Sequence, residues 1–302
     1  MTGETEHELR GDYSRMGPDY SVDQEWERYT PEEHELWRRL YRRQESLVPK
    51  YACDEFIGTL ATLNFGEGIP RFDAINRKLK VATDWQLVAV PGLVPDITFF
   101  DHLANRRFPV TVWLRTPAEF AYIVEPDIFH DFFGHVPMLF NPVFANYMQA
   151  YGKGGIKAHA LGAIEMLARL YWYTVEFGLI DTPKGPRTYG AGILSSGGEI
   201  SYCLESPNPN RIGFDLLRIM QTHYKIDTFQ ETYFVIRDFD QLFEATAPDF
   251  TPYYDQLRGR DPHAPSAVLA TDRVLHRGTS LDLDPKRLDH VVGPVDEPHV
   301  GA

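Results

Sequence analysis

Two histidines five residues apart give the clearest sign of chemistry in the chain. They are His130 and His135 in the segment EPDIFHDFFGHVP. On a regular α-helix, residues i and i+5 point about 140° apart, whereas residues i and i+4 share a face. If both imidazoles bind one metal ion, the helix must therefore be broken. Gly134 and Pro137 predict that break, because glycine tolerates left-handed dihedral angles at a helix end and proline cannot continue a helix.

A third ligand must come from elsewhere in the chain, and Glu176 is the natural candidate. No cysteine is suitably placed, whereas Glu176 lies near the end of an apolar helical stretch, LYWYTVEF. A buried glutamate is rarely left unpaired. Two histidines and one carboxylate, with open positions opposite them, suit Fe(II) and leave room for O₂ and a co-substrate. The pattern therefore points to redox chemistry.

Arg115 and Asp127 are candidates for binding a substrate carboxylate. Arg115 follows an expected strand, and Asp127 lies just before the first histidine. An arginine held by an aspartate can bind a carboxylate in bidentate fashion, although a surface ion pair is the alternative interpretation. Trp172 lies four residues before Glu176 and can form an aromatic wall beside the metal, although aromatic stripes are more often core packing.

A zinc hydrolase is the alternative from a different class of protein, because the same three ligands could hold zinc and an activated water. A zinc peptidase places its histidines at i and i+4 with a glutamate between them. Here the spacing is one residue longer and the intervening acid is Asp131. We therefore rank the hydrolase below the iron site.

The elements that must position these residues are mostly helical. Thr30, Pro31 and Glu33 have the pattern of a capping box at the start of a helix over 31–48. Apolar periodicity predicts further helices and a few short strands. The helices are expected at 53–64, 71–82, 96–108, 125–133, 142–151, 158–178, 213–224 and 238–246, with a short one after 189–199, and the strands at 85–90, 109–114 and 231–237. The predicted fold class is mainly α (α+β), a single catalytic domain of packed helices with a few short β-strands.

Composition limits the partners and the compartment. The 302 residues carry 43 Asp and Glu against 30 Lys and Arg, and this acidic balance disfavours nucleic acid and anionic membrane surfaces. No apolar run approaches the roughly 20 residues that span a bilayer. Only two cysteines are present, which fits a reducing compartment, so we expect a cytoplasmic protein. We expect an acidic N-terminal arm over 1–29, a catalytic domain over 30–260 and a loosely ordered C-terminal tail over 261–302.

Three motifs in this order and spacing resemble the pterin-dependent aromatic amino acid hydroxylases: EPDIFHDFFGHVPML, LYWYTVEFGL and YGAGILSSGGE. The likeness runs from about Asp19 to Phe243 and is closest to bacterial members that act on phenylalanine. It implies the catalytic fold of that family and a non-haem Fe(II) monooxygenase of phenylalanine catabolism. Such an enzyme uses a tetrahydropterin (tetrahydrobiopterin or a related pterin) and O₂ to convert L-phenylalanine to L-tyrosine. The nearest alternatives are the same chemistry on tryptophan or at the meta position of phenylalanine, and a metal- or pterin-binding protein without turnover.

The resemblance also implies roles for individual residues. The iron ligands match His130, His135 and Glu176. The substrate-binding positions match Arg115, Asp127, Trp172, Phe177, Gly192 and Ser195. The pterin-binding positions match Gly92, Leu93, Val94, Phe99, Asp131, Ala168 and Tyr171, with Phe99 as the ring that stacks on the pterin. Glu199 matches an acid that lies behind the groups in contact with the metal.

The chain also departs from the animal members of this family. It has no room for an N-terminal regulatory domain and ends without a helical tetramerisation tail, so we expect a monomer without allosteric control by phenylalanine. Asp131 is shorter than the glutamate of many animal members, and Ile123 replaces a threonine of their substrate pocket. Both changes leave the fine preference for substrate and pterin open.

Overall fold

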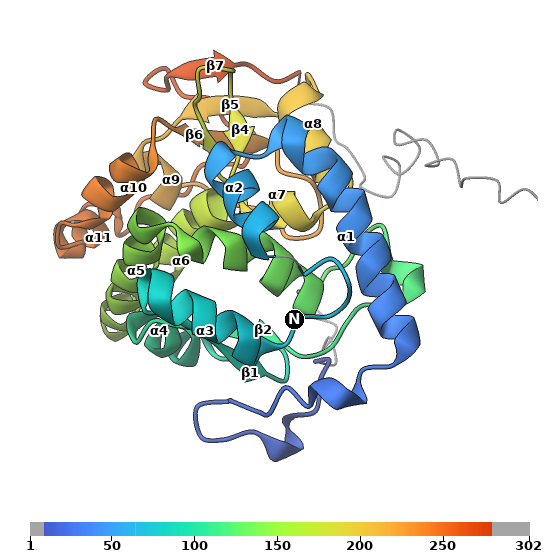
Figure 1. Ribbon diagram of the computed structural model, residues 1–302. Helices are drawn as coiled ribbons and strands as arrows, with labels where there is room; N and C mark the ends of the chain where they lie inside the picture. Colours follow the sequence, from blue (N-terminus) through green and yellow to red (C-terminus); the bar gives the residue numbers. More distant parts are fainter. Residues whose placement is uncertain (1–8, 64, 280–302) are drawn as a thin grey trace, which may run out of the picture.

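The computed structural model describes residues 9–63 and 65–279 and is built mainly from helices (Figure 1). The helices are α1 (Pro31–Tyr51), α2 (Asp54–Leu63), α3 (Phe72–Thr83), α4 (Asp96–Ala104), α5 (Pro142–Ala160), α6 (Ile164–Tyr171), α7 (Ala191–Ser195), α8 (Glu199–Glu205), α9 (Leu216–Met220), α10 (Phe239–Thr246) and α11 (Thr251–Leu257). Within this described part of the chain, no helix is both long enough and apolar enough to cross a membrane.

The strands are short and form two separate sheets. They are β1 (Gln86–Val90), β2 (Arg107–Thr111), β3 (Leu179–Ile180), β4 (Arg187–Thr188), β5 (Asn210–Gly213), β6 (Thr232–Ile236) and β7 (Val274–His276). β1 and β2 pair in parallel, and the larger sheet has the order β4-β3-β6-β5-β7. Figure 1 places the larger sheet at the top and the pair β1-β2 at the bottom, with helices between them. The predicted class, mainly helical with few short strands, is confirmed.

Helix α1 begins as its sequence predicts. The Thr30 side chain accepts from the Glu33 backbone N–H, the Glu33 carboxylate accepts from the Thr30 N–H, and Pro31 occupies the first turn. The buried face carries Trp37, whose ring meets Phe129 and Phe132 edge-on at centroid distances of 5.2 and 6.0 Å. The first predicted helix therefore packs against the histidine-bearing segment.

The single long helix expected over 158–178 is wrong. Helix α5 already runs from Pro142 to Ala160, the chain turns at 161–163, and α6 begins at Ile164. Gly162 has a φ of 62°, so the left-handed conformation that glycine favours ends the first helix there. The expected helix over 213–224 is also too long: α9 spans only Leu216–Met220, and Gly213 belongs to strand β5.

The described parts of the N-terminal arm and of the C-terminal tail both contact the body of the protein. In the arm, the Arg10 guanidinium contacts Glu119 at 2.7 Å and the Tyr13 hydroxyl donates to the Leu93 carbonyl at 2.9 Å. In the expected tail, residues 261–279 pack on the body through strand β7 and the buried ion pair of Arg218 with Asp272. Residues 1–8 and 280–302 lie outside the described residues.

Because α4 packs closely on α5, alanine substitutions at two nearby glycines of α5 should have opposite effects on stability. A methyl group at Gly152 would lie 2.3 Å from the Ala104 backbone nitrogen, whereas one at Gly154 would meet nothing within 4 Å. We expect Gly152→Ala to lower the free energy of unfolding by about 1–3 kcal/mol. Gly154→Ala should raise it by about 0.5–1 kcal/mol. Urea unfolding measures both, and equal effects would contradict the packing described here.

Candidate functional site

A π-helical turn brings the two histidines together. Residues His130–His135 follow i→i+5 hydrogen bonding instead of the α-helical pattern. In that geometry, residues five apart lie nearly one turn apart, and π-turns are frequent at functional sites. The imidazole centroids are 5.2 Å apart. The predicted helix over 125–133 is therefore corrected as well, because Glu125 and Pro126 lie before it and the helical residues begin at Ile128.

Gly134 has a different role from the one its sequence suggests. It does not adopt a left-handed conformation, so it does not end the helix in the predicted way. Instead, a methyl group on Gly134 would lie 2.7 Å from the Ala191 carbonyl oxygen at the start of α7. Glycine is required here because helix α7 crosses the π-turn at close range. The sequence predicts special backbone at this point, but the physical cause is a close contact between two segments.

A second π-helical turn, over Trp172–Glu176, presents the candidate carboxylate to both histidines. The Phe177 N–H donates to the Trp172 carbonyl at 2.9 Å, five residues back. Glu176 Oε1 lies 3.2 Å from His135 Nε2, and Oε2 lies 3.6 Å from His130 Nε2. The structure thus assembles the three groups predicted as metal ligands, with both Nε2 atoms facing the same carboxylate.

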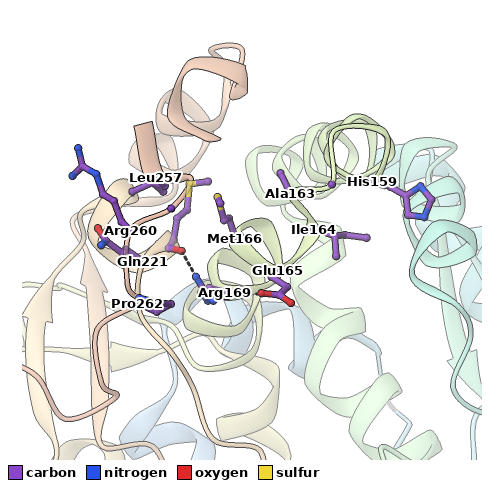
Figure 2. Close-up of a pocket in the computed structure, with 13 residues that line it drawn as sticks. His159, Ala163, Ile164, Glu165, Met166, Arg169, Gln221, Leu257, Arg260 and Pro262 are labelled. Atoms are coloured by element: carbon purple, nitrogen blue, oxygen red, sulfur yellow. Dashed lines mark hydrogen bonds and ion pairs between the residues drawn. The ribbon is translucent and has the colours of Figure 1, made fainter. Parts of the chain in front are cut away.

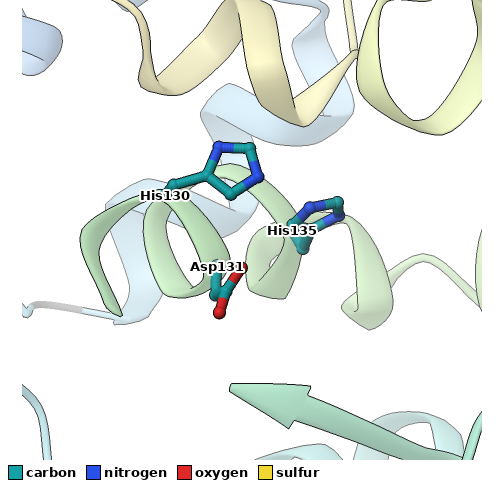
Figure 3. Close-up of side chains that lie close together, drawn as sticks. All are labelled: His130, Asp131 and His135. Carbon is teal, nitrogen blue, oxygen red and sulfur yellow. The ribbon is translucent and has the colours of Figure 1, made fainter. Parts of the chain in front are cut away.

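Asp131 is a second carboxylate close to the histidines. Its ligand atom lies within 4.8 Å of those of His130 and His135, and Figure 3 shows the three side chains together. Asp131 Oδ2 accepts the Thr111 backbone N–H at 2.8 Å, and burial raises the pKa of Asp131. Glu176 has the more ligand-like position, because its two oxygens face the two Nε2 atoms and its pKa is lowered.

The protonation states of this cluster suit a divalent metal. Burial lowers the pKa of His130, which favours the neutral imidazole. Burial acts to raise the pKa of Glu176, but the neighbouring His135 and His130 and the Gly192 N–H outweigh it, so the pKa is lowered. Metal binding requires neutral histidine and ionised carboxylate. The donor set of two imidazoles and one carboxylate also matches non-haem Fe(II).

Ser195 fixes the orientation of His130. The Ser195 hydroxyl donates to the Ala191 carbonyl at 2.9 Å, and its oxygen lies 2.9 Å from His130 Nδ1. Because the hydroxyl proton is used on Ala191, Nδ1 carries the proton and donates to Ser195. Nε2 is then the unprotonated nitrogen, directed at Glu176. The family resemblance assigns Ser195 to substrate binding and does not predict this contact with His130.

Arg115 and Asp127 form the predicted pair, in a buried rather than a surface environment. Arg115 Nε and Nη2 donate to the two Asp127 carboxylate oxygens at 2.8 and 2.9 Å, and the side chains are 3% and 0% exposed. Burial acts to raise the pKa of Asp127, but Arg115 outweighs it and the pKa is lowered. Asp127 Oδ1 also accepts the His130 backbone N–H at 3.0 Å. The carboxylate therefore joins the arginine to the first turn of the histidine segment.

A cavity of about 190 Å³ joins most of the predicted substrate residues to the metal cluster. Its lining includes Arg115, Ile123, His130, Trp172, Glu176, Phe177, Gly192, Ser195 and Glu199. The Trp172 ring lies 4.8 Å from Phe177 and stacks on Tyr224 at 4.4 Å, so one wall is aromatic. Tyr122, Ile226 and Thr228 also line the cavity and were missed, because no spacing pattern links their segments to the histidines.

The predicted pterin residues do not line this cavity. The Phe99 ring of α4 meets Tyr171 at 5.6 Å, and Tyr171 lies 6.5 Å from the His135 ring. Aromatic contacts therefore connect Phe99, through Tyr171, to the imidazole of His135. Gly92 is held close to the N-terminal arm, since a methyl group there would lie 2.6 Å from the Arg10 carbonyl oxygen. Leu93 and Val94 follow Gly92 directly, and Ala168 is half-buried on α6.

Glu199 is a buried acid in the wall of the cavity. Its Oε1 accepts the Tyr233 hydroxyl at 2.6 Å and the Gln230 backbone N–H at 3.1 Å. Burial raises the pKa of Glu199 to about 7. The group is therefore close to half-protonated near neutral pH.

A second cavity, of about 560 Å³, lies outside the cluster (Figure 2). It is bounded by the start of α6 and the segment after α11, and none of the predicted site residues lines it. Arg169 is its buried cation and donates to the Met220 carbonyl at 3.1 Å. Its greater size does not make it the candidate site, because it lacks the paired histidines and carboxylate.

Comparison with known proteins agrees with this geometry. The sequence model of the family described as biopterin-dependent aromatic amino acid hydroxylase matches residues 7–252. The phenylalanine-4-hydroxylase of Chromobacterium violaceum is 60% identical over 261 residues, covering 86% of this chain and 88% of that protein. The phenylalanine-4-hydroxylase of Caulobacter vibrioides is 55% identical over 263 residues, covering 87% and 90%.

A solved structure gives the same fold. The iron- and phenylalanine-bound crystal structure of phenylalanine hydroxylase from Chromobacterium violaceum has a TM-score of 0.83 at 59% identity. The match covers 87% of this chain and 96% of that chain. The predicted catalytic fold is therefore confirmed.

Replacing Glu176 and Asp131 in turn should show which of the two carboxylates is the third metal ligand. We expect Glu176→Ala to lose stoichiometric Fe(II), because the carboxylate that faces both Nε2 atoms is removed. Asp131→Ala should retain it, since Asp131 bonds to the Thr111 backbone. Metal analysis after dialysis measures the iron content, and circular dichroism checks that both variants are folded. Iron loss only in the Asp131 variant would reverse the assignment.

Glu199 should make stability depend on pH. Because its pKa is raised, the carboxyl group of Glu199 binds a proton more tightly in the folded chain than in the unfolded chain. Its contribution to the free energy of unfolding is therefore fully present below about pH 4.5 and is lost as pH rises through about 7. Between pH 5 and 7.5 the loss is about 2 kcal/mol.

Glu199→Gln retains an acceptor oxygen without the charge, so its free energy of unfolding should fall less with rising pH. Chemical denaturation at several pH values measures this difference. Glu45→Gln on the exposed side of α1 is the matched control and should follow the wild type. An unchanged pH profile for Glu199→Gln would contradict the prediction.

Proposed function

Because the chain belongs to the family of biopterin-dependent aromatic amino acid hydroxylases, we propose that it is a phenylalanine 4-monooxygenase. It uses Fe(II), a tetrahydropterin and O₂ to convert L-phenylalanine to L-tyrosine. The observation that carries this function is the convergence of His130, His135 and Glu176, of which His130 and Glu176 line a small cavity. The same cavity offers an arginine for a carboxylate and an aromatic wall for a ring.

The residues fit Fe(II). We assign His130 Nε2, His135 Nε2 and a Glu176 oxygen as its ligands, since these groups face one another and are largely shielded from solvent: the side chains of His130, His135 and Glu176 are 17%, 4% and 12% exposed. Two histidines and one carboxylate leave about three positions open for exchange. When bound, iron and the tetrahydropterin supply the activation of O₂ and the electrons for hydroxylation. The protein supplies the positions of the substrates and the exclusion of water.

Arg115 is the group that we assign to the substrate carboxylate. Asp127 accepts one hydrogen bond from Nε and one from Nη2 of Arg115. Nη1 has no hydrogen-bond acceptor within the described part of the chain and belongs to a side chain that lines the cavity. A guanidinium fixed on one edge binds a carboxylate without losing side-chain entropy, which favours a single orientation of the amino acid.

Trp172 and Phe177 are the groups that we assign to the aromatic ring of the substrate. They line the cavity beside Glu176, so a ring packed on them lies next to the metal ligands. Gly192 packs closely against Phe177: a methyl group on Gly192 would lie 2.7 Å from the Phe177 ring. This apolar wall also excludes water from a strongly oxidising centre.

The pterin belongs on the other side of the ligands in this proposal. Phe99 offers a ring for stacking, and Tyr171 connects it to His135. Gly92, Leu93 and Val94 supply backbone at the end of β1, while Ala168 and Asp131 complete the group. This placement of the pterin is supported by the aromatic contacts that run from Phe99 of α4 through Tyr171 to His135.

We also propose that the enzyme acts as a cytoplasmic monomer that binds small molecules and neither nucleic acid nor membranes. Cys53 and Cys203 are free and buried, which fits a reducing compartment. The net charge of −13 is unfavourable for binding polyanions. Light scattering on the full chain should give a mass near 34.7 kDa, and a multiple of it would contradict the monomer.

Product analysis tests the function directly. The purified chain is loaded with Fe(II) and supplied with L-phenylalanine, a tetrahydropterin and O₂, and the product is compared with tyrosine isomers by mass spectrometry. We expect para-tyrosine, formed in step with pterin oxidation and lost on chelation of the metal. Meta-tyrosine would correct the position of attack. Peptide or ester hydrolysis that needs no O₂ would instead support the zinc hydrolase.

A further inference from the structure

Gln230 is a buried amide that joins three parts of the cavity wall. It lies just before strand β6 and is 3% exposed. Its Oε1 accepts the Trp172 indole N–H at 2.9 Å, and its Nε2 donates to the Lys225 carbonyl at 3.1 Å. Its own backbone N–H donates to Glu199 at 3.1 Å. No sequence pattern singled out Gln230, because all these partners are distant in the chain or belong to an irregular segment.

The hydrogen bonds leave this amide only one orientation. The indole N–H of Trp172 is a donor only, so it requires the amide oxygen. The Lys225 and Thr228 carbonyls are acceptors only, so they require the amide nitrogen. Neither an apolar side chain nor a carboxylate can satisfy both sides. A glutamine at this position therefore fixes the indole and the segment 225–228 at the same time.

The indole that Gln230 holds is part of the aromatic wall. Trp172 stacks on Tyr224 with an angle of 15° between the rings, and it meets Phe177 on another side. Ring stacking alone permits an indole to slide or turn in its plane, since stacked contacts are weakly directional. The bond to Gln230 removes that freedom, because the N–H is the only polar group of the indole.

We propose that Gln230 is a positioning residue that sets the specificity of the cavity, and this inference rests on the proposed function. By fixing the Trp172 indole in one orientation within its plane, Gln230 keeps a cavity of about 190 Å³ matched to a single six-membered ring. Without the bond, the indole turns, the wall packs less closely on phenylalanine, and space opens for the bicyclic side chain of tryptophan. Gln230 acts through Trp172 and need not touch the substrate.

The principal variant is Gln230→Met, which keeps the length of the side chain and removes the amide. We expect the dissociation constant of L-phenylalanine, measured by calorimetry on the Fe(II)-loaded protein without pterin, to rise about tenfold. The ratio of kcat/KM for L-phenylalanine over L-tryptophan should fall about tenfold. The near-ultraviolet circular dichroism of the aromatic wall should also change.

The matched control is Gln221→Met. Gln221 also donates to a backbone carbonyl, that of Asp261, but it lies outside the residues that line the substrate cavity. This variant should keep the binding and the substrate ratio of the wild type. If both variants change the ratio equally, the effect is general destabilisation and the proposal is overturned.

A double-mutant cycle tests whether Gln230 acts through the indole. Trp172→Phe removes the indole N–H, so Gln230→Met should change the substrate ratio little further in that background. A second fall of about tenfold would overturn the proposed route. If Gln230→Met does not fold, Gln230→Asn replaces it, because a shorter amide withdraws from the indole while it remains polar.

Product formation by the wild type separates the proposed function from the proposed role of Gln230. If it forms no para-tyrosine, the proposed function fails, and binding of L-phenylalanine to the variants still tests Gln230. If it forms para-tyrosine and Gln230→Met keeps both the affinity and the substrate ratio, the function stands and the role of Gln230 is rejected.

Discussion

The i→i+5 hydrogen bonding of two short π-turns is the constraint on which the site depends. One turn places His130 and His135 on a common side, and the other directs Glu176 at both of their Nε2 atoms. An α-helix at either position would turn a ligand away. Because π-turns are unfavourable in isolation, packing must hold them, and the contact of Gly134 with Ala191 shows how closely α7 approaches.

Buried polar pairs then fix the groups around this centre. Asp127 bonds to Arg115 and to the His130 backbone, so the candidate carboxylate-binding group and the first ligand share one anchor. Ser195 sets the protonated nitrogen of His130, and Gln44 of α1 donates to the Leu194 and Ser196 carbonyls on either side of Ser195. Groups held this firmly need little reorganisation when charge develops, which is how a preorganised site aids catalysis.

The aromatic residues have two separate tasks that their sequence spacing does not distinguish. Phe129, Phe132 and Phe133 are fully buried at the π-turn. Trp37 packs on Phe129 and Phe132, and Phe133 stacks on Phe129, so these rings stabilise the turn. Trp172 and Phe177 instead face the cavity, where they offer a surface to a substrate ring. The difference arises from polar neighbours, since Gln230 ties the Trp172 indole to the cavity wall, while the phenylalanines lie among apolar groups.

Patterns among neighbouring residues are enough to predict the capped start of α1, the mainly helical class, the histidine pair and a carboxylate suited to join it. The folded chain is needed to see how His130 and His135 meet, why Gly134 is glycine, that the expected long helix is divided at residue 162, and which side chains fix Ser195 and Trp172. Caps and periodicity are local and can be read from spacing. π-turns, close contacts and buried hydrogen bonds depend on segments that meet only after folding, so residue order alone does not contain their geometry.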